Sequence, residues 1–219
     1  MRCLILYYSM TGQAEKSAAL AADAARENGW DATICRMRMS DPADVLARPM
    51  NIAASKKWTQ GAQKGMTVPL AFDPPEAVTQ RYDAVLLFSN TWGDHPSVPV
   101  RSFLESPDAK ALLAGTPVGV YVVCRRLWEK NLAIVRGLIE NAGGRFVGGE
   151  PFMHPGGQVG SLIQTITYLY RTDSGRKRFM GFPLPRYGLS DEAIARVPGF
   201  TRELLAAART DKINVEGAA

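Results

Sequence analysis

CLILYYSMTGQAEKSAALAADAA, residues 3–25, is the stretch that decides the fold. Its apolar run Leu4–Tyr8 predicts a buried strand, and the Ala-rich run from about Ala14 to Asn28 predicts a helix. The turn between them, residues 9–13, carries two hydroxyls and a glycine. A helix that begins directly after a strand points free backbone N–H groups and the positive end of its dipole at one place. The turn therefore predicts a phosphate site, with an ordinary turn that binds nothing as the alternative.

Two better-known phosphate loops are absent from the sequence. It contains no G-x-x-x-x-G-K-[ST], which disfavours a nucleoside triphosphatase, and no G-x-G-x-x-G follows the first strand, which disfavours a dinucleotide-binding turn. The net charge of +5 indicates either solvated basic loops or attraction for an anionic ligand such as a flavin or nicotinamide phosphate. No basic face interleaved with aromatic residues is visible, so nucleic-acid binding is not expected.

Length and composition fit one α/β domain over residues 1–219. No apolar run approaches the ~20 residues of a membrane span, and no signal peptide is visible. The three cysteines, Cys3, Cys35 and Cys124, lack metal-ligand spacing, as do the histidines His95 and His154. We therefore expect reduced thiols in a cytoplasmic protein with no metal site.

Apolar strands alternate with helical segments through most of the chain. This alternation predicts a five-stranded parallel sheet with helices on both faces. Right-handed crossovers and a phosphate turn after the first strand fit the doubly wound order 2-1-3-4-5, in which ligands bind at the carboxyl ends of the strands. The later strands are Ala32–Met37, Ala84–Phe88, Val118–Val123 and one from Phe146, and the later helices begin near Val98, span Leu127–Asn141 and span Ser190–Ala208.

Two segments, about 40–80 and 152–189, are longer than ordinary connections and predict insertions that form a lid or a subunit contact. The first contains a possible helix at Ala43–Lys57. The second contains the apolar stretch Val159–Tyr170 and the basic turn Arg171–Arg178. A helix there would present an apolar face as core or dimer interface, and we expect a homodimer. The face comprises Leu162, Ile163, Ile166, Leu169 and Tyr170.

Two further loops reach the predicted ligand edge. The loop after the third strand carries Trp92, which could stack on a flat heteroaromatic ring or simply pack against the loop, and Gly93, which permits close approach of the backbone. The loop after the fourth strand carries Arg125 and Arg126, which could bind a phosphate, a carboxylate or an electron-rich ring.

Three other side chains near these loops could carry chemistry. Arginines and a helix N-terminus next to Cys124 would lower its pKa and favour the thiolate, although no His or Asp stands nearby in the sequence. His95 and His154 could each donate a proton to a bound ring, or be ordinary loop histidines.

The three loops together resemble the flavodoxin-like family over about residues 1–150. The family's phosphate loop corresponds to residues 9–15, S-M-T-G-Q-A-E. Its flavin-stacking loop corresponds to residues 89–93, S-N-T-W-G, and its third loop corresponds to residues 124–128. The resemblance implies bound FMN. It places Ser9, Met10, Thr11, Gly12, Gln13 and Ala14 around the phosphate and Asn90, Thr91, Trp92, Gly93, Cys124 and Arg125 around the ring system.

Some positions depart from the family pattern. The family often has a small residue at Met10 and Thr or Ser at Ala14, and electron-carrier flavodoxins have an acidic, aromatic third loop where this chain has two arginines. The resemblance therefore implies an FMN-dependent oxidoreductase that moves electrons from NADH or NADPH to a small planar, quinone-like substrate, rather than an electron carrier. Its expected catalytic residues are Arg125, Arg126 and His95.

A narrower resemblance links the chain to dialkylresorcinol condensing enzymes. It rests on Y-Y-S-x-T-G-Q, residues 7–13, P-S-V-P-V-R-S-F-L, residues 96–104, C-R-R-L-W, residues 124–128, and the second insertion. It implies an alternative function in secondary metabolism, namely flavin-independent condensation or cyclisation of a β-keto acyl chain. Cys124, Arg125, Arg126, His95 and His154 would then line an acyl pocket.

Overall fold

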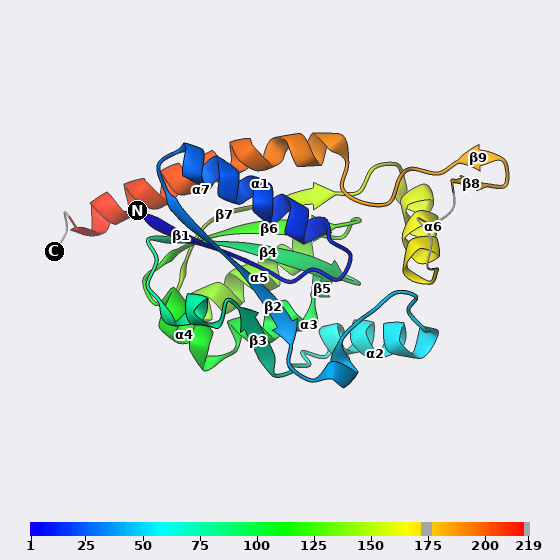
Figure 1. Ribbon diagram of the computed structural model, residues 1–219, viewed down its shortest axis with the longest axis horizontal. Coiled ribbons are helices and arrows are strands. Elements are labelled where there is room, and N and C mark those ends of the chain that lie inside the picture. The colour runs from blue at the N-terminus through cyan, green and yellow to red at the C-terminus, as the bar shows by residue number, and fades with distance from the viewer. Residues whose placement is uncertain (172–176, 217–219) are drawn as a thin grey trace.

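A computed structural model describes residues 1–171 and 177–216, with side chains described up to residue 210. The predicted doubly wound sheet is confirmed, because its five parallel strands run in the order β2-β1-β4-β6-β7 (Figure 1). These strands are β1 (Arg2–Tyr7), β2 (Asp31–Met39), β4 (Ala84–Trp92), β6 (Pro117–Cys124) and β7 (Arg145–Met153).

Two short antiparallel strands extend the five-stranded prediction. The edge strand β3 (Leu70–Asp73) pairs with β2, and β5 (His95–Pro96) folds back on the end of β4. The edge strand arises within the first insertion and is only half buried. A four-residue strand within a long insertion is too short for its apolar pattern to distinguish it from a loop.

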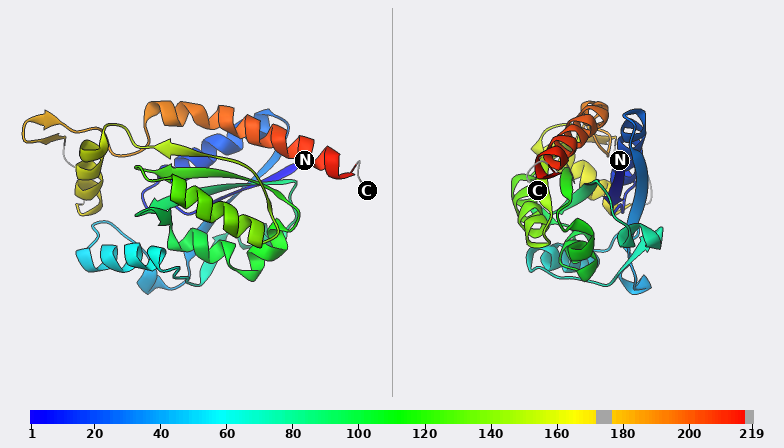
Figure 2. Two further views of the ribbon diagram at one scale, coloured as in Figure 1. Left: turned by 180° about the vertical axis from the view of Figure 1, so that it is seen from behind. Right: turned by 90° about the vertical axis from the view of Figure 1, so that its left-hand side faces the viewer.

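Helices cover both faces of the sheet. Helices α1 (Gln13–Glu27) and α7 (Asp191–Glu216) lie on one face, and α3 (Val98–Leu104), α4 (Pro107–Leu113) and α5 (Glu129–Asn141) lie on the other (Figure 2). Each face has its own buried cluster of apolar side chains. On the first face Tyr121 stacks on Phe88 at 4.3 Å, and its hydroxyl lies 2.7 Å from that of Thr201 on α7.

The first insertion differs from its prediction. The expected helix at Ala43–Lys57 is wrong in position: a short 3-10 helix, η1 (Pro42–Asp44), is followed by an extended segment, and α2 (Ile52–Gln63) begins only afterwards. The Asn51 side chain accepts a hydrogen bond from the backbone N–H of Ala54 and so fixes this start. A second 3-10 helix, η2 (Pro75–Thr79), follows β3.

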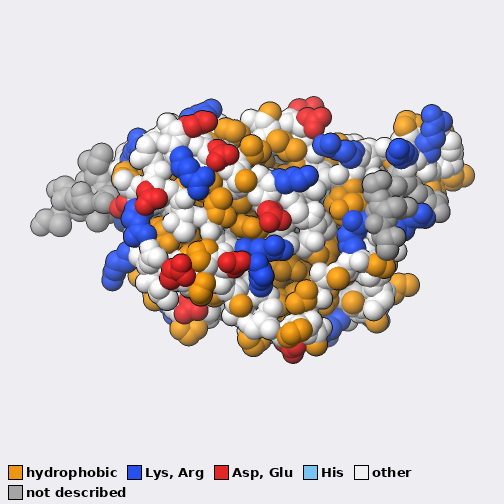
Figure 3. All heavy atoms as spheres, in the orientation of Figure 1, with side chains coloured by type: hydrophobic (Ala, Val, Ile, Leu, Met, Phe, Trp, Pro, Cys, Tyr) orange, Lys and Arg blue, Asp and Glu red, His pale blue; other side chains and the backbone are white. Residues whose placement is uncertain are grey.

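The second insertion contains α6 (Gln158–Leu169) and a hairpin of β8 (Arg178–Phe179) and β9 (Phe182–Pro183). The helix is confirmed, but its apolar face is not core in this chain, since Leu162 and Ile166 are 41% and 47% exposed. Ser161 and Gln164 are buried in their place. Apolar and basic side chains also cover the projecting hairpin (Figure 3). Residues 172–176 of the expected basic turn lie outside the described residues.

The two insertions contact each other beyond the carboxyl edge of the sheet (Figure 1). The backbone N–H of Met50 donates to the carbonyl of Leu169 at 2.8 Å. The Arg48 guanidinium donates to the carbonyls of Tyr168 at 2.6 Å and Arg171 at 3.0 Å. Within the described ranges, no helix is long and apolar enough to cross a membrane.

Candidate functional site

The turn after β1 has the geometry of an anion cradle. Gly12 adopts φ +79°, a left-handed conformation that favours glycine, and α1 begins at the next residue. The N–H groups of the first helical turn are therefore free to face a ligand. The hydroxyl of Ser9 is buried and has no hydrogen-bond partner among the described residues. A buried hydroxyl of this kind is costly unless a ligand or water satisfies it.

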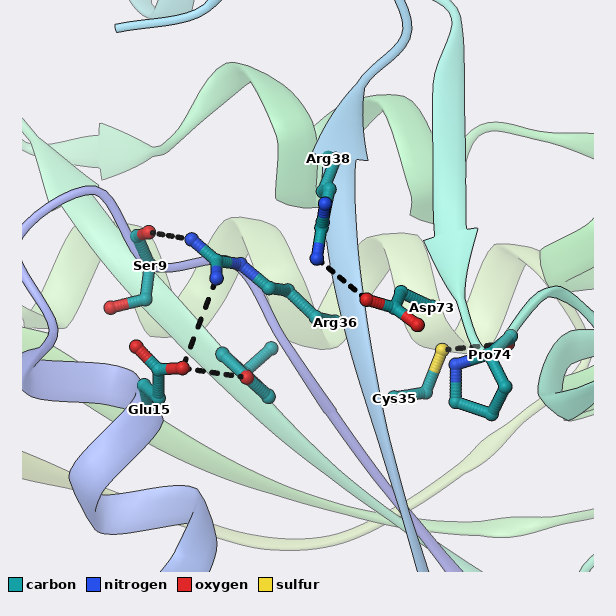
Figure 4. A network of polar contacts seen from close by, with 8 residues as sticks. Ser9, Glu15, Cys35, Arg36, Arg38, Asp73 and Pro74 are labelled. Carbon is teal, nitrogen blue, oxygen red and sulfur yellow. Dashed lines mark hydrogen bonds and ion pairs between the residues drawn. The ribbon is translucent and has the colours of Figure 1, made fainter. Parts of the chain in front are cut away.

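Arg36 from β2 braces this turn (Figure 4). Its guanidinium donates to the Ser9 carbonyl at 3.3 Å and lies 3.8 Å from the Glu15 carboxylate in the first turn of α1. Beside it, Arg38 pairs with Asp73 at 2.6 Å. Sequence analysis missed Arg36, although the alternation of cysteine, arginine and methionine in β2 places it on one side of the strand.

Trp92 lies at the end of β4, between the cradle and α2. Its ring is half buried and meets Tyr8 and Trp58 edge-on, with centroids 6.1 and 5.9 Å apart. Trp92 contributes to the walls of two adjoining cavities. Stacking of Trp92 on a ligand ring stays a prediction.

Asn131 on α5 fixes the backbone of this loop. Asn131 is fully buried and accepts a hydrogen bond from the Ser89 hydroxyl at 2.8 Å. Its amide nitrogen donates to the carbonyl of Asn90 at 3.2 Å and the hydroxyl of Thr91 at 2.8 Å. The side-chain oxygen of Asn90 is buried without a partner among the described residues, a second unsatisfied polar atom at this edge.

The two neighbouring arginines after β6 have different surroundings. Arg126 donates to the carbonyls of His154 and Gly156, and so holds the loop that follows β7. Arg125 donates through Nη1 to the Gln158 carbonyl at 3.1 Å and borders both cavities. Burial, and then the charge of Arg126, lower the pKa of Arg125.

The expectation of a Cys124 thiolate is wrong. Burial raises the pKa of the Cys124 thiol to about 12 and outweighs the opposing effect of Arg126 and Arg125. Helix α5 begins only at Glu129, so its N-terminus is not adjacent to the thiol. Cys124 is therefore protonated at neutral pH and acts as part of the wall.

The two histidines are placed differently. His95 sits on β5 with Nδ1 2.5 Å from the Asp94 carboxylate, which also binds Lys130 at 3.0 Å, and it borders neither cavity. His154 does border the first cavity. Burial, Arg125 and Arg126 together lower the pKa of His154 to about 4, so it is neutral at pH 7.

Residues 187–189 of the second insertion, here called the strap, contact the turn between β1 and α1. The Tyr187 hydroxyl donates to the Thr11 hydroxyl at 3.2 Å, and the Leu189 N–H donates to the Gln13 side chain at 3.0 Å. Gly188 has φ +122°, and a Cβ at this position would lie 2.7 Å from Oε1 of Gln13. The backbone of the strap can therefore approach Gln13 this closely only because residue 188 is glycine.

Aromatic stacking supports the strap. Tyr187 stacks on Tyr168 with centroids 3.7 Å apart, and the Arg48 guanidinium lies 3.3 Å from the Tyr168 centroid. The edge of His154 meets Tyr187 at 4.9 Å. These contacts were not predicted from the sequence, because they join residues that are not neighbours within one helix or strand and carry no local pattern.

Two cavities adjoin at this edge of the sheet. The first, about 130 Å³, lies among the three loops and the strap, and the second, about 360 Å³, lies between the loops and helices α2 and α6. Within residues 1–171 and 177–210, no group of three His, Cys, Asp or Glu side chains could hold a metal. The predicted site residues around the first cavity are Met10, Thr11, Gln13, Asn90, Thr91, Trp92, Cys124 and Arg125, and Gly93 and Arg126 border the second.

Comparison with known proteins bears on the fold. No family model and no curated protein matches the chain. A flavoprotein from Lactobacillus acidophilus, solved in complex with FMN, superposes with TM-score 0.52 and 17% identity over 68% of this chain and 92% of its own. Flavodoxin 2 from Bacillus cereus superposes with TM-score 0.51 and 16% identity over 94% and 99%. A flavodoxin from Archaea gives 0.50 and 9% over 97% and 99%. The fold is flavodoxin-like.

Proposed function

We propose that this protein binds FMN at the carboxyl edge of its sheet. The observation that carries the proposal is the buried hydroxyl of Ser9, which has no partner among the described residues and lies in the turn that leads directly into the N-terminus of α1. The FMN phosphate supplies the acceptors that this turn lacks. Thr11 is already bonded to Tyr187, so the strap would hold or cover the phosphate together with the turn.

The ring-binding part of the site would consist of the other two loops. Trp92 offers an aromatic surface, and Asn90 an unpartnered amide oxygen that can accept a hydrogen bond from a ring N–H. Arg125 places positive charge at the same edge, where it would stabilise negative charge on the ring.

We further propose an oxidoreductase. When bound, FMN would take hydride from NADH or NADPH and deliver electrons to a small planar, quinone-like substrate. The chain's own residues would orient both reactants. The two insertions would limit the access of water, and Arg126, next to Arg125, ties the loop after β6 to the loop after β7 that carries His154. His95, which lies outside both cavities, would act indirectly by ordering Asp94 and the turn after Trp92.

The alternative, a condensing or cyclising enzyme of the dialkylresorcinol type, is favoured by one observation. The second cavity is mostly apolar and could accept an acyl chain. The protonated, buried Cys124 argues against it, because the nucleophile that such a reaction could use is not available. We therefore place it second.

An FMN titration followed by visible absorbance tests the main proposal. We expect saturable binding, and a roughly tenfold loss of affinity in Trp92→Ala, since removal of an aromatic contact costs about 1.4 kcal/mol. Trp128→Ala is the matched control, because Trp128 is also partly buried but borders neither cavity. The absence of saturable binding at high FMN concentration would refute the proposal. If FMN binds, oxidation of NADH and NADPH then tests turnover.

We also propose a cytoplasmic homodimer. The exposed apolar residues of α6 and the hairpin, Leu162, Ile166, Met180 and Phe182, form a surface that a second copy could bury. Light scattering after size-exclusion chromatography should give twice the monomer mass, and Leu162→Glu should shift it toward the monomer. A monomer at all concentrations would exclude this arrangement.

A further inference from the structure

The second cavity lies next to the proposed ring site but is built from different elements. Helix α2 and the segment before it form one wall, and α6 forms the opposite wall. Trp92, Thr165 and Arg125 border both cavities, so a molecule in the second cavity would contact the same groups as a ring in the first. Its lining is largely apolar, with Leu46, Met50, Trp58, Leu127, Leu162 and Leu169 as the main contributors.

The charged side chains that line this cavity are all positive within the described part of the chain. Arg125 and Arg126 border the cavity, and no Asp or Glu among the described residues does so. Arg126 already donates to the carbonyls of the loop after β7. The hydrogen bonds described for Arg125 all use Nη1, so Nε and Nη2 have none within the described part of the chain.

A second polar group belongs to the same wall, because Thr165 on α6 lines both cavities together with Arg125. The hydroxyl of Thr165 is buried and has no hydrogen-bond partner among the described residues. A buried hydroxyl without a partner and a partly desolvated guanidinium are each costly in the wall of an apolar cavity. A ligand carrying an anionic oxygen would satisfy both groups, whereas a wholly apolar ligand would leave both unsatisfied.

The cavity volume limits the ligand. About 360 Å³ lies at the lower end of the range for small-molecule pockets and is far too small for a whole nicotinamide dinucleotide. It suits a compact body such as a one- or two-ring aromatic or a short acyl chain.

We propose that the second cavity is a substrate pocket for a compact apolar molecule that carries one carboxylate or similar anionic group, held by Arg125 and Thr165. The inference names the substrate class of the oxidoreductase proposed above and rests on that proposal for turnover, but not for binding. It makes an uncharged quinone a poorer ligand than its acidic analogue.

A direct test compares naphthalene-2-carboxylate with naphthalene-2-carboxamide, which have the same shape and differ in charge. Trp58 and Trp92 line the cavity, so binding can be followed by quenching of their fluorescence and checked by calorimetry. We expect the carboxylate to bind at least tenfold more tightly than the amide, as for a charge-assisted pair in a partly buried site.

Three substitutions test which residues cause the preference for the carboxylate over the amide. Arg125→Gln should abolish this preference, and Arg125→Lys should retain part of it. Thr165→Val should weaken binding of the carboxylate a few-fold. Arg136→Gln on the exposed side of α5 is the matched control and should change nothing. The comparison of the two ligands on the unaltered protein stands even if Arg125→Gln fails to fold.

FMN binding is measured on the same samples, which separates the two proposals. If the protein binds FMN but binds carboxylate and amide equally, or neither, the substrate inference is overturned and the FMN proposal survives. If it prefers the carboxylate and ignores FMN, the cavity assignment survives and the flavin function is overturned.

Discussion

Replacement of Asn131 by alanine tests how α5 positions the Trp92 loop. Asn131 is fully buried and makes hydrogen bonds to Ser89, to the backbone of Asn90 and to Thr91. Each such bond contributes about 1 kcal/mol net, and their loss leaves buried polar groups unsatisfied. Alanine regains about 0.5 kcal/mol of helix propensity. We expect the free energy of unfolding to fall by about 3 kcal/mol.

Urea unfolding measures this difference. For an m-value of about 2 kcal/mol per M, the midpoint should fall by about 1.5 M. Asn141→Ala at the exposed end of the same helix is the matched control and should change the free energy of unfolding by less than about 0.5 kcal/mol. Ser89→Ala, which removes one of the bonds, should cost about 1 kcal/mol.

The same variant reports on the site. Because Asn131 holds the backbone that carries Trp92, its replacement should weaken FMN binding several-fold even in conditions where the variant is fully folded. A loss of stability below about 1 kcal/mol, or unchanged FMN affinity in the folded variant, would show that the loop does not depend on Asn131.

Three further outcomes follow from the geometry. Burial raises the pKa of Cys124 from 9.0 to about 12. Iodoacetamide at pH 8 should therefore alkylate Cys124 roughly 1000-fold more slowly in the native protein than in the urea-unfolded protein. Fast modification of the native protein, detected by mass spectrometry, would contradict this. Burial lowers the pKa of His154 from 6.5 to about 4, so the folded protein binds fewer protons there than the unfolded protein. The free energy of unfolding should therefore fall by up to about 3 kcal/mol as the pH drops from 7 to 4. In unfolding experiments at several pH values, His154→Gln should show a weaker dependence on pH. Gly188→Ala places a Cβ 2.7 Å from Gln13 in a left-handed conformation and should lower the Tm by about 5 °C. Gly137→Ala, which has open space around it, should not lower the Tm. Equal melting temperatures of the two variants would show that the close approach of the strap to Gln13 does not require glycine.

The sequence predicted the elements whose structure depends on residues close together in the chain. The strand, turn and helix of residues 2–27 are neighbours in the chain, so apolar periodicity and a glycine turn place them within a residue or two. The predicted parallel order 2-1-3-4-5 rested on the alternation of strands and helices, on crossover handedness and on the type of turn after the first strand, all of which can be recognised in the sequence. The predicted position of the helix at Ala43–Lys57 was wrong, because the Asn51 cap, rather than helix propensity, sets where α2 begins.

The sequence alone thus predicted the sheet, the turn between β1 and α1, and the meeting of the three loops at one edge. The tertiary structure decided the surroundings of those loops. Neighbouring arginines suggested an ionised Cys124, yet burial prevails, because the loss of hydration costs a thiolate more than two partly solvated cations return. The contact of Tyr187 with Thr11 spans 176 positions and depends on how two insertions pack, which no local pattern encodes.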